Sequence, residues 1–310
     1  MDGRPTGRFA PTPSGRLHLG NLLCAMLAYL SARSQGGRFL LRIEDVDVPR
    51  CPRRASEQCV EDLRRLGFTW DGPIVYQSER GEAYAEALAR LRAMGRIYPC
   101  FCTRAELHSL QAPNQGDGSP VYPGTCRGLT EAERAERRLR RSPSLRVRLP
   151  EARVGFRDGQ YGWQSADLAR DCGDPIVLRS DGLYAYPLAV VVDDAASGVD
   201  EIVRGRDILP ATPVQLALQA MLGLPAPRYR HIPLLTDADG RRLAKRDRDL
   251  DLTALSRRFS PEELLGLLAC AAGILEEPEP MDLERLIPRF DWARVRRDDM
   301  RLPRSLTDKA

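Results

Sequence analysis

The amino-acid sequence predicts an α/β fold in which an insertion divides one parallel sheet into two halves. Predicted strands alternate with predicted helices in residues 1–98 and again in residues 175–250, and such alternation is typical of parallel sheets. Residues 99–174 interrupt the alternation with a turn-rich stretch, so they are expected to form an inserted subdomain. Residues 251–310 have a helical pattern and are expected to form a helical C-terminal region.

A tight loop is predicted between the first strand and the first helix. Residues 8–10 can form a short strand, and the prolines and glycine within residues 11–16 exclude regular structure just after it. A helix is expected after Gly20, because apolar side chains recur on one helical face in residues 22–30. Backbone N–H groups at a helix start attract phosphate, and a ring N–H of His18 could reach the same anion. The alternative is an ordinary strand–helix turn.

Lysine is almost absent, which makes one position informative. Of the 47 basic residues only two are lysines, Lys245 and Lys309. A chain so biased toward arginine that keeps Lys245 is expected to need an ammonium there, because an ammonium is a compact charge with rotatable donors suited to a phosphate. The alternative for Lys245 is a solvated loop lysine, and Lys309 lies beside the C-terminus.

Two segments resemble the signature motifs of class I aminoacyl-tRNA synthetases. The stretch from Pro11 to Asn21 is similar to their HIGH segment, and Arg242 to Arg246 is similar to their KMSKS loop, with Asn21 and Arg242 as departures from the motifs. The resemblance implies a Rossmann-like catalytic domain that forms an acyl-adenylate from ATP with Mg²⁺. It also implies that His18 and Lys245 stabilise phosphate charge, and that ATP is bound by His18, Gly20, Asn21, Arg242 and Lys245.

An acidic cluster follows a second predicted strand. Residues 38–43 are expected to form a buried parallel strand, with Glu44 and Asp45 at its carboxyl end, where ligands sit in open α/β sheets. A carboxylate there can bind an α-ammonium group. The alternative is a local ion-pair network of Arg42, Glu44 and Asp45.

Two arginines suggest a second charged contact. The apolar, β-branched run in residues 184–192 is interpreted as another buried strand, and it contains Tyr186. Arg8 and Arg204 could both reach a bound carboxylate, because a guanidinium pairs with a carboxylate in a bidentate fork. Two arginines in one pocket suggest a dicarboxylic amino acid.

From Arg8 to about Asp247 the chain resembles the glutamyl-tRNA synthetase branch of the class I family. That resemblance implies that Glu44 holds the amino group of glutamate and that Tyr186 and Arg204 hold the carboxylate end. The complete glutamate site implied in this way comprises Arg8, Phe9, Ala10, Pro11, Thr12, Glu44, Tyr186 and Arg204.

Three of the eight cysteines are spaced like metal ligands. The chain opens on a polar stretch and has no long apolar run, so a reducing, cytoplasmic location is expected, in which cysteines are thiols or metal ligands. Cys100, Cys102 and Cys126 in a turn-rich segment suit one tetrahedral zinc ion. Chemistry alone favours His108 as the fourth ligand, whereas resemblance to glutamyl-queuosine tRNA(Asp) synthetases favours Tyr122. Three unrelated cysteines are the alternative.

The length of the chain selects among synthetases. Roughly 65 residues follow Lys245, which is too few for an anticodon-binding domain of the usual kind. The chain therefore resembles the truncated glutamyl-queuosine tRNA(Asp) synthetase family. That resemblance implies activation of L-glutamate without tRNA and transfer to the cyclopentene-diol of queuosine, at the wobble position of tRNA(Asp). The expected partner is the queuosine-bearing anticodon stem-loop, bound by a monomer.

Three other functions remain open. These are a conventional synthetase that esterifies a tRNA 3′ end, a non-catalytic RNA-binding protein, and a zinc-based RNA module. The net charge of +4 permits RNA binding without demonstrating it. A helix is expected at residues 131–141, and its basic end either contacts a phosphate backbone or is simply solvated.

Capping boxes are predicted at Thr212, with Gly223 ending that helix, and at Ser260.

Overall fold

The computed structural model describes residues 4–109, 121–236 and 251–302. Its N-terminal strands form a parallel sheet in the order β1 (Thr6–Phe9), β2 (Arg38–Ile43) and β3 (Val75–Tyr76). The helices α1 (Leu19–Ser34), α2 (Arg53–Arg65) and α3 (Gly81–Ala93) alternate with these strands along the chain. The alternation predicted for residues 1–98 is therefore confirmed.

A second set of strands continues the sheet beyond β1. Strands β9 (Glu201–Gly205), β10 (Arg228–Ile232), β6 (Arg153–Asp158) and β7 (Gly162–Asp167) follow in the order β7-β6-β10-β9. The amide of Asp200, just before β9, donates to the carbonyl of Thr6 in β1 at 3.1 Å, so β9 lies against β1. Strand β6 comes from the predicted insertion and pairs parallel with β10, so the insertion adds an edge to the central sheet.

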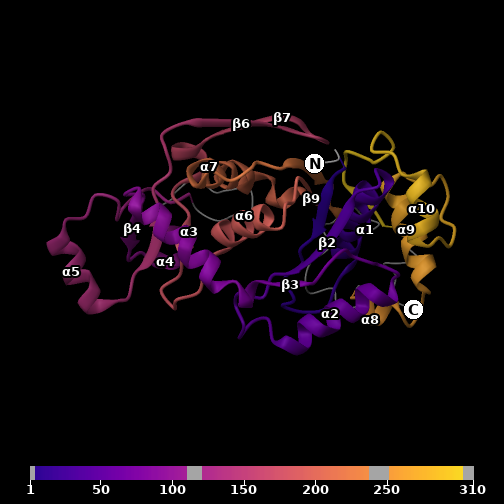
Figure 1. Ribbon diagram of the computed structural model, residues 1–310, viewed down its shortest axis with the longest axis horizontal. Helices are drawn as coiled ribbons and strands as arrows, with labels where there is room; N and C mark the ends of the chain where they lie inside the picture. Colours follow the sequence, from indigo (N-terminus) through magenta and orange to yellow (C-terminus); the bar gives the residue numbers. More distant parts are fainter. Residues whose placement is uncertain (1–3, 110–120, 237–250, 303–310) are drawn as a thin grey trace.

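The rest of the predicted insertion forms a smaller antiparallel unit together with the strands that flank it. Strands β4 (Ile97–Cys100), β5 (Ser144–Val147) and β8 (Ile176–Leu178) pair in that order, beside α4 (Arg104–Ser109) and α5 (Glu131–Arg140). In Figure 1 this unit projects at the end of the molecule far from α1 and the C-terminal helices. Helix α5 confirms the helix predicted at residues 131–141 and has no buried residue.

The segment predicted as a buried strand after Tyr184 is instead a helix. Helix α6 (Tyr186–Ala196) buries Leu188 and Val191 along with both acidic residues at its end, Asp193 and Asp194. Pro187 occupies the first turn, where a missing N–H costs nothing. A short apolar run does not distinguish a buried strand from a helix buried on most of its surface, which is why the strand prediction was wrong.

Thr212 does not cap helix α7 (Thr212–Leu222). The N-cap is Ala211 without a side-chain hydrogen bond, and the Thr212 hydroxyl accepts from Arg204 instead, so the capping box predicted there was wrong. Gly223 ends the helix in the left-handed conformation, as expected. The capping box at Ser260 is confirmed at the start of α9 (Pro261–Ala272).

The described C-terminal residues form short helices packed on α1. These are α8 (Leu252–Leu255), α9 and α10 (Leu283–Leu286), and a last strand, β12 (Met300–Arg301), pairs with β11 (Leu235–Thr236). Figure 1 shows α9 and α10 beside α1. Together with the sheet they cover α1 so fully that eleven of its sixteen residues are buried. Short helices of one or two turns occur at Gln77–Glu79, Leu168–Cys172, Arg206–Ala211 and Ile287–Arg289. Among the described residues, no helix combines the length and the apolar character needed to cross a membrane.

Candidate functional site

The start of helix α1 is organised by His18 and Asn21. His18 is the N-cap residue: its Nδ1 accepts from the Asn21 amide at 3.3 Å, and the Asn21 side-chain oxygen accepts from the His18 amide at 3.2 Å. This reciprocal pair gives Asn21, one of the departures from the family motif, a defined structural role. A Cβ on Gly20 would lie 3.1 Å from Cε1 of His18, so the glycine leaves room for the imidazole ring.

The protonation of His18 follows from this cap. Because Nδ1 accepts a hydrogen bond, the proton of a neutral ring is carried by Nε2. Arg242 and Lys245 lie outside the described residues. The chain resumes at Asp251, which forms a backbone bridge with His18, and Leu252 donates to the carbonyl of Leu17 at 2.9 Å. The segment that follows the KMSKS-like stretch therefore returns to the start of α1.

A buried ion-pair cluster lies at the carboxyl ends of β1 and β2. Asp194 on α6 accepts from Nε of Arg8 at 3.2 Å and from Nη1 of Arg42 at 2.6 Å. Arg42 also donates to Glu44 at 3.3 Å, and the Thr12 hydroxyl lies 3.4 Å from the other Glu44 oxygen. An Arg42–Glu44 pair was one of the alternatives drawn from the sequence, but Asp45 stands apart from it.

Asp45 faces another partner. Its two carboxylate oxygens accept from the amide and the hydroxyl of Ser78, each at 2.9 Å. The remaining residues implied for the glutamate site surround the end of β1: Phe9 is buried, Ala10 is half-buried, and the carbonyl of Pro11 accepts from the amide of Glu44 at 2.9 Å. The loop after β1 and the end of β2 are therefore joined at Glu44.

The two carboxylates of the cluster differ in how easily they ionise. Burial raises the pKa of Glu44 and outweighs the opposing effect of the Arg42 and Arg8 charges. Burial also acts on Asp194, but there the two guanidiniums outweigh it and lower the pKa. Asp194 therefore neutralises the arginines, whereas Glu44 would gain from an additional cation such as a ligand ammonium group.

Arg204 is buried on β9, the strand that lies against β1. Its Nη1 donates to Oε1 of Gln215 and its Nη2 to the hydroxyl of Thr212, both at 2.8 Å, and Nη1 also lies 3.5 Å from the Tyr186 hydroxyl. The structure thus brings Tyr186 and Arg204 together, as the sequence implied. The charges of Arg204, Glu44 and Arg8 all act on the Tyr186 hydroxyl, whose pKa burial raises.

Sequence reasoning missed four residues that hold the arginines of this site. Asp194 pairs with Arg8 and Arg42, Gln215 and His231 accept hydrogen bonds from Arg204, and Asp158 bonds to His231 in turn. Asp194 was visible in the sequence, but the strand prediction gave it the wrong periodicity. A helical periodicity would have turned it toward the core one turn after Val190. The other three are contributed by β6, α7 and β10, and nothing in their local sequence signals a ligand site.

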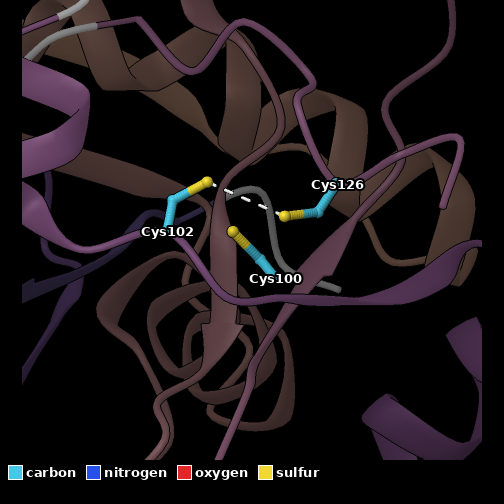
Figure 2. Close-up of side chains that lie close together, drawn as sticks. All are labelled: Cys100, Cys102 and Cys126. Atoms are coloured by element: carbon cyan, nitrogen blue, oxygen red, sulfur yellow. Dashed lines mark hydrogen bonds between the residues drawn. The ribbon is translucent and has the colours of Figure 1, made fainter. Parts of the chain in front are cut away.

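The three predicted metal ligands converge. The sulfur atoms of Cys100, Cys102 and Cys126 lie within 4.8 Å of one another, and Figure 2 shows all three turned toward one point. The Tyr122 hydroxyl lies 3.5 Å from the Cys100 sulfur and accepts from the Cys126 amide at 2.8 Å. The side chain of His108 lies outside the described set. Three thiols and a phenol oxygen fit the donor set of a tetrahedral soft-metal site.

The thiols of this cluster cannot all ionise without a cation. Burial, together with the neighbouring Cys100 and Cys126, raises the pKa of Cys102 to about 12. A metal ion would remove this repulsion, because thiolates rather than thiols are its ligands. The three cysteines that the sequence singled out thus lie together in the fold.

Comparison with known proteins places these features in a family. Residues 6–263 match the family described as tRNA synthetases class I (E and Q), catalytic domain. A protein of Symbiobacterium thermophilum named glutamyl-Q tRNA(Asp) synthetase is 49% identical over 309 residues, covering 96% of this chain and 95% of that protein. A protein of the same name from Nocardia farcinica is 47% identical over 305 residues, covering 97% and 93%.

Solved structures show a similar fold. A crystal structure of glutamate-tRNA synthetase from Elizabethkingia anophelis superposes with a TM-score of 0.82 at 25% identity, covering 98% of this chain and 69% of that chain. A glutamate tRNA ligase from Elizabethkingia meningosepticum, in complex with its amino acid, gives 0.81 at 25% identity, covering 98% and 68%.

Replacing Asp194 by asparagine is expected to lower the free energy of unfolding by about 3–5 kcal/mol, because it leaves two buried guanidiniums short of a counter-charge. Urea unfolding of the wild type and the variant measures this. Since the pKa of Asp194 is lowered in the folded state, the difference should be complete above about pH 4 and shrink as the pH falls further.

Asp181→Asn is the matched control. Asp181 pairs with Arg179 at the surface, where an ion pair contributes no more than about 1 kcal/mol. Equal losses in the two variants would contradict a special role for the buried cluster.

Proposed function

Because this chain belongs to the class I tRNA synthetase family for E and Q, we propose that it activates L-glutamate with ATP and transfers the glutamyl group to queuosine of tRNA(Asp). The product would be a glutamyl ester on the cyclopentene-diol at the wobble position. The anticodon stem-loop would dock on the catalytic domain of a cytoplasmic monomer. RNA loops suit this recognition, because their unstacked bases and modifications are accessible.

The observation that carries the proposal is the pairing of opposite charges around Tyr186. Glu44 provides a buried carboxylate whose ionisation a ligand ammonium would favour, and Arg204 provides a guanidinium beside the Tyr186 hydroxyl. An α-amino acid with a second carboxylate carries the complementary groups. Asp194 cancels much of the charge of Arg8 and Arg42, so Arg204 is the better candidate for a direct contact with the substrate carboxylate.

Adenylate formation needs charge stabilisation more than covalent participation by the protein. The α-carboxylate oxygen of glutamate would attack the α-phosphorus of ATP while the bond to pyrophosphate breaks. His18 would donate from Nε2, and Lys245 would add a positive charge to the phosphates. Mg²⁺ supplies further positive charge when it is bound to the phosphates. Gly20, Asn21 and Arg242 would complete the ATP contacts.

Transfer follows on the same face of the protein. A queuosine hydroxyl oxygen would attack the carbonyl carbon of the mixed anhydride, the acyl–phosphate bond would break, and AMP would leave. The chemistry differs from ordinary tRNA charging only in the position of the hydroxyl.

The cysteine cluster is proposed to hold one structural zinc ion. Cys100, Cys102, Cys126 and Tyr122 would be its ligands, with Tyr122 favoured over His108 because its hydroxyl already lies beside two of the cysteines. A site closed by four protein ligands supports structure rather than catalysis.

Glutamate-dependent ATP–pyrophosphate exchange is expected without any tRNA, and aspartate and glutamine should not replace glutamate. The second half of the experiment compares queuosine-containing with queuosine-lacking tRNA(Asp) as glutamyl acceptors, and only the former should be labelled. Exchange that requires tRNA(Glu) would indicate a conventional synthetase. Absence of ATP–pyrophosphate exchange under all conditions would favour an RNA-binding protein without catalytic activity.

Lys245→Ala is expected to slow adenylate formation by about 10²–10³, the usual cost of removing one charge-stabilising donor. Pyrophosphate exchange at saturating glutamate and ATP measures this rate. The other lysine of the chain supplies the control, since Lys309→Ala should exchange at the wild-type rate. An unchanged rate in Lys245→Ala would refute the role of its ammonium group.

Purified protein is expected to carry close to one equivalent of zinc, and Cys100→Ser should lose it because the hydroxyl is a poor ligand for a soft metal site. Metal analysis by mass spectrometry after gel filtration gives the stoichiometry. Cys270→Ser is the control, because Cys270 lies on α9 outside the cluster. Freshly purified wild-type protein that contains no zinc would contradict the assignment of the cysteine cluster as a zinc site.

A further inference from the structure

Three buried side chains form a continuous hydrogen-bonded series behind the amino-acid site. Asp158 ends strand β6, His231 lies on β10, and Arg204 lies on β9. Nδ1 of His231 lies 2.6 Å from Oδ2 of Asp158, and Nε of Arg204 donates to Nε2 of His231 at 3.0 Å. The exposed fractions of Asp158, His231 and Arg204 are 1%, 0% and 4%, so water does not compete for these bonds.

The chemistry of arginine fixes the tautomer of His231. A guanidinium can only donate, so Nε2 of His231 must carry a lone pair, and the ring proton therefore lies on Nδ1 and is donated to Asp158. Burial lowers the pKa of His231 to about 4, despite the hydrogen bond to Asp158, which keeps the ring neutral in ordinary buffers. In a protonated ring Nε2 would also carry a hydrogen, so two donors, Nε2–H of His231 and Nε–H of Arg204, would face each other.

Asp158 is itself held firmly in place. Its Oδ1 accepts from the amides of Gln160 and Tyr161, each at 2.9 Å, and its Oδ2 accepts from the amide of His231 at 3.1 Å. These three backbone donors fix the orientation of the carboxylate. Burial raises the pKa of Asp158, but the hydrogen bonds from the His231 ring and from the amides of Tyr161 and Gln160 outweigh it and lower the pKa, so the carboxylate stays ionised.

The donors of Arg204 can be counted. Of the five N–H groups of a guanidinium, one goes to His231, one to Gln215 and one to Thr212. Within residues 4–109, 121–236 and 251–302 the other two find no short contact, and one of them makes only the long 3.5 Å contact with the Tyr186 hydroxyl. Contacts on three sides fix the guanidinium plane while two donors stay available to a carboxylate.

We propose that His231 and Asp158 are positioning residues that hold Arg204 so that its two remaining donors face the carboxylate end of the bound amino acid. This inference rests on the proposed function, in which Arg204 contacts glutamate. The benefit is preorganisation: an arginine side chain has many rotamers, and ordering it before the substrate arrives removes that cost from binding. Strand β6 thereby links the inserted segment to substrate recognition.

Asp158→Asn tests directly whether the hydrogen-bonded series of Asp158 and His231 positions Arg204. The backbone donors of Gln160 and Tyr161 would keep the amide oxygen at the Oδ1 position, so the NH₂ group would face Nδ1 of His231. The ring must then carry its proton on Nε2, against Nε–H of Arg204. We expect the KM for glutamate in pyrophosphate exchange to rise about 10- to 100-fold, comparable to loss of a hydrogen bond to a charged group, while the KM for ATP stays unchanged.

The tautomer can be observed without any activity. The chain has three histidines, so ¹⁵N-imidazole NMR of histidine-labelled protein resolves few signals. His231 should show the Nδ1–H form in the wild type and the Nε2–H form in Asp158→Asn. An unchanged His231 tautomer in Asp158→Asn would overturn the positioning role of Asp158 and His231, even if the protein is active in pyrophosphate exchange. A wild type inactive with glutamate would instead overturn the proposed function and, with it, the positioning role.

Two substitutions of His231 separate positioning from packing. His231→Gln can place an amide oxygen near the Nε2 position and still accept from Arg204. His231→Asn can donate to Asp158 from the Nδ1 position but has no atom that reaches Arg204. Both remove the ring, so both should lose similar thermal stability, yet only the asparagine variant should raise the KM for glutamate by 10- to 100-fold. Equal KM values in the two variants would show that His231 serves packing alone.

Discussion

The candidate site depends on a buried ion-pair cluster in which one carboxylate, that of Asp194, contacts two guanidiniums. Arg8 lies on β1 and Arg42 lies on β2, each near the carboxyl end of its strand. Asp194, on α6, forms an ion pair with both arginines. Ions buried this deeply are tolerated only when they are paired and hydrogen-bonded. The pairing therefore fixes the distance between the first half of the sheet and the helix that precedes its second half.

The same arrangement gives Glu44 its distinct character. Arg42 is shared between Asp194 and Glu44, and its shorter contact is with Asp194, at 2.6 Å against 3.3 Å. Glu44 is thus only partly compensated while it is buried, which is the condition under which a carboxylate gains most from a new cation. The cluster holds two guanidiniums and two carboxylates, but its shorter contacts go to Asp194, so Glu44 is the carboxylate that a further cation would stabilise most.

Local sequence predicted the elements whose signals are local. The loop after β1, the helix that begins beside His18 and the strand β2 each have their turn formers or periodicity within a few residues, and all are present. Helix α6 was misread because it is buried on most of its surface, so its apolar run lacks a polar face. The role of Asp194 was missed together with that helix. Its partners lie more than 150 residues away in the sequence, so local patterns could not reveal them.

Contacts between distant segments explain the rest of what sequence reasoning missed. Thr212 follows the local pattern of a cap, but its hydroxyl is occupied by Arg204, so tertiary structure overrides the local preference. His231 has no motif around it, and only the parallel pairing of β10 with β9 and β6 places it between Arg204 and Asp158. The sequence alone indicated the residue types of the proposed substrate contacts, whereas the residues that hold them in place were identified only from the order of the strands in the sheet.

The inserted segment approaches the site from two directions, which gives it more than a peripheral role. Asp158 supports Arg204 from behind, and Tyr122 and Arg146 share a cavity of about 170 Å³ with Pro187 of α6 and Gln215 of α7. The Arg146 guanidinium lies 3.6 Å from the centre of the Tyr122 ring, and both residues line the cavity that is also bordered by Gln215, a partner of Arg204. Tyr122 therefore links the cysteine cluster to the cavity wall formed by α6 and α7, where Gln215 holds Arg204.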